Sequence, residues 1–109
     1  MIPLVAQNLE AIAELCRRFG VLKLDLFGSA ATGEFNQETS DLDFVVDFGE
    51  YAPGYLDRFF GLEEALKHLF GRDVDLVTEK SIQNPIFRRS VDRSRKPIYR
   101  ERAHRQEVA

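Results

Sequence analysis

Apolar residues recur along this chain with two different periods, and the longer period, of three to four residues, predicts three helices. Residues 4–19 carry apolar side chains three or four positions apart, which is typical of a helix with one buried face. Gly20 follows at the position just past the helix end, where glycine is common. A second stripe of this kind runs over 55–70, ahead of Gly71. Residues 84–94 predict a shorter helix, which begins with a proline.

The shorter period, in which apolar and polar residues alternate, predicts three strands, at 21–27, 41–48 and 73–77. Residues 96–101 form a last strand or extended segment, and the polar, turn-rich stretch 32–40 is a loop. The order helix, strand, strand, helix, strand, helix implies an α/β (α+β) protein. We therefore expect a mixed β-sheet with helices packed on one face.

The 109 residues fit one domain, with about 101–109 as a flexible tail. Apolar residues make up 44% of the chain, so a core can form, but no apolar run is long enough for a membrane helix. The start is not basic, so we expect no signal peptide and no membrane association. The single cysteine, Cys16, lies on a predicted apolar helix face and favours a reducing, cytoplasmic setting.

Charge is distributed unevenly along the chain. Residues 86–109 hold eight basic and three acidic side chains, whereas 1–85 hold seven basic and fifteen acidic ones. A basic C-terminal segment can meet nucleotide phosphates, RNA or an acidic partner, or it can be a solvated helix face.

Two aspartates one residue apart mark the most distinctive chemistry. Asp41 and Asp43 project from the same face of a predicted strand, with Cα atoms about 6.6 Å apart, because Leu42 and Phe44 must face the core. Two carboxylates this close favour a hard cation between them, Mg²⁺ or Mn²⁺. Asp75 has the same orientation on another predicted strand. If the two strands pair, three carboxylates form a two-metal site, and Asp75 can also accept a proton.

A glycine and a serine, Gly28 and Ser29, end the preceding strand. Glycine permits a sharp turn and close backbone approach, while the serine hydroxyl and the following amides can bind phosphate oxygens. Ala30 and Ala31 begin a short helix, whose N-terminus favours an anion. Ser29 could instead simply cap that helix.

The stretches GSAATGEF, SDLDFVV and VDLV together resemble the polymerase β-like nucleotidyltransferases, and most closely the minimal nucleotidyltransferases, or MNT proteins. The resemblance covers nearly the whole chain. It assigns the nucleotide-phosphate contact to Gly28 and Ser29, and the metal-binding catalytic carboxylates to Asp41, Asp43 and Asp75. One departure is Thr32, where the family commonly has arginine; Arg88, Arg89 or Arg93 could replace that cation.

The resemblance also implies a partner and a reaction. MNT proteins are typically paired with a HEPN-domain toxin, which some of them neutralise by transferring AMP from ATP to a tyrosine. We therefore expect a protein adenylyltransferase antitoxin that uses ATP and Mg²⁺ and binds no nucleic acid directly. The main alternative is an antitoxin that masks its toxin by stoichiometric binding. A small-molecule transferase ranks third, because a chain of this length leaves no separate acceptor domain.

Other polar residues have simpler interpretations. Asp25, Asp47 and Asp73 are predicted to be solvent-facing strand residues, and Tyr51, Tyr55 and Tyr99 to be packing residues rather than modification sites. His68 has no second histidine or cysteine at a spacing that suits a metal.

Overall fold

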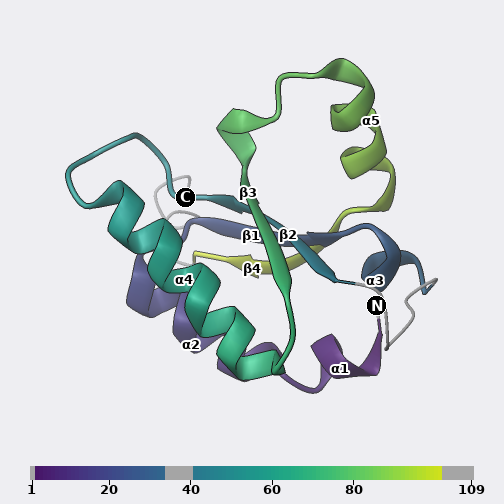
Figure 1. Cartoon of the computed structure of the whole chain (residues 1–109), viewed down its shortest axis with the longest axis horizontal. Coiled ribbons are helices and arrows are strands. Elements are labelled where there is room, and N and C mark those ends of the chain that lie inside the picture. Colours follow the sequence, from purple (N-terminus) through teal and green to yellow (C-terminus); the bar gives the residue numbers. More distant parts are fainter. Residues whose placement is uncertain (1, 34–40, 102–109) are drawn as a thin grey trace, which may run out of the picture.

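A four-stranded mixed sheet forms the centre of the computed structural model, which describes residues 2–33 and 41–101 (Figure 1). The strand order is β3-β2-β1-β4. The strands are β1 (Lys23–Phe27), β2 (Leu42–Asp47), β3 (Val74–Thr78) and β4 (Lys96–Arg100). β1 pairs antiparallel with β2 and β4, whereas β2 and β3 are parallel. The predicted mixed sheet is confirmed, and its last segment is a true strand.

Five α-helices and one short 3-10 turn accompany these strands in the described part of the chain, two of the helices preceding β1. They are α1 (Pro3–Ala6), α2 (Leu9–Phe19), α3 (Ser29–Thr32), α4 (Tyr55–Phe70), η1 (Glu79–Ser81) and α5 (Pro85–Ser94). The parallel pair β2 and β3 needs a crossover, and α4 provides it.

The main core lies between one face of the sheet and the pair α2 and α4, which run over that face (Figure 1). The strand residues predicted to point inward do so: Leu24, Leu26, Leu42 and Phe44 are fully buried. The helices contribute Ile12, Cys16, Leu62 and Leu66, which are equally buried. Each such side chain adds about 1.5–3 kcal/mol through burial. This core fixes which strand residues face the other way.

The opposite face of the sheet is also covered in part, which the sequence prediction of helices on one face missed. Phe27, Val45, Ile82 and Val91 form a second apolar cluster there. Val91 brings α5 onto this face, so α5 lies across the sheet from α2 and α4 (Figure 1). The sheet is therefore a layer between helices, with α5 covering only part of its second face.

The predicted helix over 4–19 is two helices. α1 ends before Gln7, and α2 begins after Asn8. The side-chain amide of Asn8 donates a hydrogen bond to the Leu4 carbonyl oxygen (2.7 Å), which replaces a helical backbone bond and explains the interruption. The following end is as predicted, because Gly20 adopts the left-handed conformation, with φ of 71°.

Two predicted segments fall largely outside the described residues, namely 34–40 of the loop and 102–109 of the tail. No helix within 2–33 and 41–101 combines the length and the apolar character needed to cross a bilayer.

Candidate active site

Two of the three candidate carboxylates lie side by side on neighbouring strands. β2 and β3 pair in a register that places Asp43 directly opposite Asp75. Both side chains belong to the second face of the sheet, since Leu42, Phe44 and Leu76 occupy the first. Asp41 immediately precedes β2 and is exposed. The sheet thus brings two of the predicted carboxylates together, with the third at the start of the same strand.

Burial and the neighbouring carboxylates both disfavour the charged form of Asp43. The pKa of Asp43 is raised from 3.8 to about 6, first because the carboxyl is partly buried and then because the carboxylates of Asp75 and Asp41 repel its charge. A pKa so displaced is common where a cation or proton is expected to bind. The charges of Asp75 and Asp41 therefore act on the Asp43 carboxyl in this fold.

The cluster suits a hard divalent cation by its chemistry. All its donors are carboxylate oxygens, which Mg²⁺ and Mn²⁺ prefer, and a cation would relieve the repulsion at Asp43. Among the described residues, no three acidic, histidine or cysteine side chains are already arranged to hold a metal ion. The aspartates would therefore have to draw together around the ion.

Gly28 lies against this carboxylate cluster, and its backbone requires glycine. Its φ is 75° and its ψ is −153°, a combination that side-chain-bearing residues rarely adopt. A Cβ atom at this position would meet Asp43 Oδ2 at 2.5 Å. Asp43 is also close to Gly28 through the sheet, because it pairs with Phe27 of β1. The turn and the carboxylates are thus parts of one site.

The turn is held by bonds within the chain. The Gly28 amide donates to the Ser94 hydroxyl of α5 (3.0 Å), and the Ala31 and Thr32 amides donate to the Gly28 carbonyl oxygen (3.1 and 3.2 Å). The predicted short helix is present as α3. The Gly28, Ala31 and Thr32 amides therefore already have acceptors within the chain.

A pocket of about 440 Å³ opens beside this turn. One wall comes from the turn and α3, and the other comes from α5. The lining residues are Gly28, Ser29, Thr32, Ser90, Arg93 and Ser94. The pocket therefore adjoins the predicted phosphate turn, and it is rich in hydroxyl groups.

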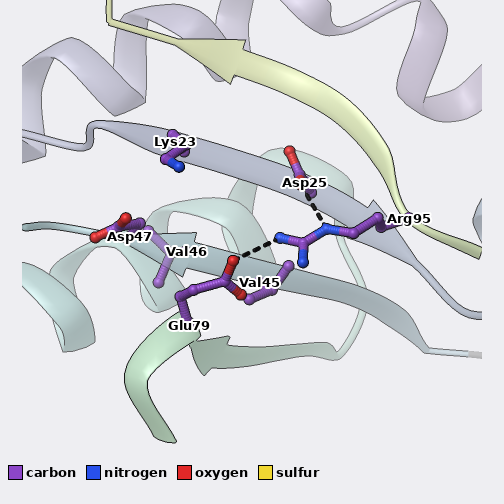
Figure 2. Close-up of a pocket in the computed structure, with 7 residues that line it drawn as sticks. All are labelled: Lys23, Asp25, Val45, Val46, Asp47, Glu79 and Arg95. Carbon is purple, nitrogen blue, oxygen red and sulfur yellow. Dashed lines mark hydrogen bonds and ion pairs between the residues drawn. The ribbon is translucent and has the colours of Figure 1, made fainter. Parts of the chain in front are cut away.

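A buried ion network on the second face of the sheet links the end of α5 and the neighbouring strand β4 to β1, and it corrects the prediction for Asp25. That residue is only 3% exposed rather than solvent-facing. Its carboxylate accepts from Arg95 Nε (2.8 Å) and Arg100 Nη1 (2.7 Å). Arg95 also reaches Glu79 Oε1 (3.0 Å), as Figure 2 shows. Two arginines of the basic C-terminal segment, Arg95 and Arg100, are therefore engaged in ion pairs within the protein.

Arg88 belongs to the same framework. Its guanidinium donates to the Glu79 carboxylate and to the carbonyl oxygens of Glu79 and Ile82, at 3.0–3.2 Å. It therefore fixes η1 against α5 and is not placed to replace a cation at Thr32. Of the three arginines considered for that role, Arg93 is the one that lines the pocket with Thr32.

Comparison with known proteins places this arrangement in a family. Residues 10–99 match the nucleotidyltransferase domain family, and this match includes every predicted site residue. The chain belongs to the nucleotidyltransferase family. The resemblance inferred from the sequence motifs is confirmed at this level.

Within this family, the nucleotidyltransferase is similar to an adenylyltransferase and to a minimal nucleotidyltransferase of known structure. It is 47% identical over 73 residues to the protein adenylyltransferase MntA of Thermococcus cleftensis, covering 67% of this chain and 71% of that protein. A solved structure described provisionally as a minimal nucleotidyltransferase has a TM-score of 0.70 and 38% identity, covering 84% of this chain and 90% of that one.

A third likeness concerns the fold alone. A solved complex described as a tri-AMPylated Shewanella oneidensis HEPN toxin with an MNT antitoxin aligns with a TM-score of 0.64 and 21% identity. The alignment covers 94% of this nucleotidyltransferase and 77% of that chain.

The sequence alone named Arg93 only as one of three arginines that could supply a cation, and it gave no role to Ser94. Ser94 and Arg93 lie more than 60 positions after Gly28, and only the packing of α5 on the second face brings them together. The available signal was Val91, the single apolar residue within 88–96, which anchors that helix. The roles of the five predicted residues remain predictions, to which the structure adds their common location.

Proposed function

We propose that this nucleotidyltransferase is the antitoxin of a HEPN-type toxin and transfers AMP from ATP to a tyrosine hydroxyl of that toxin. The observation that carries the proposal is the joint placement of Gly28, Asp43 and Asp75 at one end of the sheet. The adenylyltransferase relative supports the reaction, and the solved toxin–antitoxin complex supports the partner.

Each residue has a role that follows from its chemistry. Gly28 lets the backbone approach the triphosphate, and the Ser29 hydroxyl donates to a phosphate oxygen. Asp41, Asp43 and Asp75 would hold Mg²⁺ or Mn²⁺, which supplies neutralisation of the phosphate charge. Asp75, the more exposed of the paired carboxylates, is suited to accept a proton.

The chemical step conserves charge and atoms. The tyrosine oxygen attacks the α-phosphorus of ATP, the bond to the bridging oxygen of the β-phosphate breaks, and pyrophosphate leaves. The hydroxyl proton passes to Asp75. In such a reaction the protein contributes mainly positioning and charge neutralisation, because the transferred group needs little covalent help.

A second candidate function is masking of the toxin by binding alone. Ile86 and Phe87 of α5 are 71% and 40% exposed, which leaves apolar area available for a partner. This surface would serve either function, so it does not distinguish transfer from masking.

The test combines transfer and neutralisation. The protein is incubated with its genomic HEPN neighbour, Mg²⁺ and ATP labelled on the α-phosphate. The same assay is run with Asp43→Asn and with the control Asp57→Asn, which changes an exposed residue of α4. We expect label on the toxin with wild type and Asp57→Asn, and none with Asp43→Asn. Toxin neutralisation by Asp43→Asn without any label would favour masking. No label with wild type, under conditions where the pair is active in cells, would refute the transfer.

A further inference from the structure

We propose that Arg93 of α5 binds the pyrophosphate portion of ATP, in the pocket beside the Gly28–Ser29 turn. This inference rests on the proposed adenylyl transfer and assigns a residue from a different part of the chain to the same site. Arg93 would be a binding residue that also stabilises the leaving group.

The chemistry of the pocket favours an anion. Among the described residues that line it, Arg93 is the only charged one, and four others carry hydroxyl groups: Ser29, Thr32, Ser90 and Ser94. The Thr32 and Ser94 hydroxyls already donate to the carbonyl oxygens of Ser29 and Ser90. The Arg93 guanidinium and the Ser29 and Ser90 hydroxyls, with no carboxylate among the described lining residues, still form a surface that suits phosphate oxygens. Its volume of about 440 Å³ lies within the range common for small-molecule sites, about 300–1,000 Å³.

Arg93 is available for this role, whereas two of its neighbours are not. Arg88 and Arg95 are engaged by Glu79 and by the buried Asp25. Within residues 2–33 and 41–101, no ion pair involves Arg93. Its guanidinium is therefore held by no ion pair from the described part of the chain that would have to break before a ligand binds.

The backbone that carries Arg93 is fixed on both sides. Val91 is fully buried in the second apolar cluster, and the Ser94 hydroxyl accepts from the Gly28 amide. Arg95, the residue that follows α5, is tied to Asp25 of β1. These contacts hold the end of α5 at a constant distance from the phosphate turn, which is what a preorganised binding residue requires.

The location of the pocket indicates which part of ATP it takes. Gly28 faces the Asp43 carboxylate, whereas none of the three aspartates lines the pocket. Because AMP transfer places the α-phosphorus at the carboxylates, the other side of the turn receives the phosphates that leave. Arg93 then opposes the charge that develops on pyrophosphate as the bond breaks.

The experiment measures binding by calorimetry with Mg²⁺ and no acceptor protein, so that it is independent of transfer. The probes are α,β-methylene-ATP, pyrophosphate and AMP. The variants are Arg93→Gln, Arg93→Lys and the charge-matched control Arg89→Gln, which lies on the same helix but outside the pocket lining. Thermal unfolding checks that each variant is folded.

We expect Arg93→Gln to weaken α,β-methylene-ATP and pyrophosphate binding at least tenfold and AMP binding less than twofold. Arg93→Lys should recover part of the loss, and Arg89→Gln should match wild type within twofold. The inference is overturned if Arg93→Gln binds pyrophosphate as wild type does, if AMP binding falls equally, or if Arg89→Gln causes the same loss. If the binding differences are absent but AMP is still transferred to the toxin, only the role of Arg93 is refuted. If the binding differences are found but no AMP is transferred, only the proposed reaction is refuted.

Discussion

The exchange Asp43→Asn tests whether a charged Asp43, partly buried beside two other carboxylates, destabilises the protein when no metal is bound. The pKa of Asp43 is raised from 3.8 to about 6 by burial and by the charges of Asp75 and Asp41. A displacement of this size corresponds to at most about 3 kcal/mol against the charged form. Because the carboxyl is only partly buried, solvent screening reduces the expected effect to about 1 kcal/mol.

The sign follows from which state binds more protons. Between pH 3.8 and about 6 the folded protein holds a proton on Asp43 that the unfolded chain has lost. The wild-type protein therefore loses stability as pH rises through this window, and an asparagine of the same shape does not. In metal-free buffer, Asp43→Asn should be more stable than wild type by about 1 kcal/mol at pH 7.5. At pH 3.5 the two should be nearly equal.

Urea unfolding with a chelator present, at both pH values, measures this difference. Adding Mg²⁺ at pH 7.5 should raise the stability of wild type by more than that of Asp43→Asn, because the variant lacks one of the three carboxylates that would bind the ion. The reasoning fails if Asp43→Asn is less stable than wild type at pH 7.5 without metal. It also fails if the difference between the two proteins is the same at pH 3.5.

Three further exchanges, measured by denaturant unfolding and by AMP transfer, test the contacts that hold the turn and α5 in place. Gly28→Ala should cost about 1–3 kcal/mol and abolish transfer, since its backbone conformation requires glycine and the added carbon meets a carboxylate. Gly33→Ala has a similarly positive φ but open space, so an equal loss of transfer there would contradict the clash. Asp25→Ala should cost about 3–5 kcal/mol because it leaves two arginines without their buried partner, whereas Glu14→Gln, in an exposed pair, should cost far less. Similar costs would show that the buried network is dispensable. Ser94→Ala should lower stability by about 1 kcal/mol and slow transfer, because the Gly28 amide loses its acceptor. An unchanged rate would mean that α5 does not position the turn.

Local periodicity was sufficient to predict most of the sheet. Leu42 and Phe44 had to face the core, and strand alternation then determined the direction of Asp41 and Asp43. The same argument succeeded for Asp75 on β3. Strand alternation specifies a face, and here both candidate strands paired in the register that brings their aspartates together.

Alternation could not predict what covers the second face. Asp25 alternates like an exposed residue, but arginines from much later in the chain bury it. Such a pairing depends on where α5 and β4 pack, which no local pattern contains. The interruption at Asn8 was missed for a related reason, because a side-chain hydrogen bond replaced the helical one that the apolar spacing predicted.

Divalent-cation binding tests the central claim most directly, namely that Asp41, Asp43 and Asp75 act as one metal-holding group. Mn²⁺ is titrated into wild type, Asp43→Asn, Asp75→Asn and the control Asp57→Asn, in the presence of α,β-methylene-ATP, and bound metal is counted by electron paramagnetic resonance. We expect at least tenfold weaker binding in each of the two site variants and no change in the control. Wild-type affinity in both site variants would contradict the account.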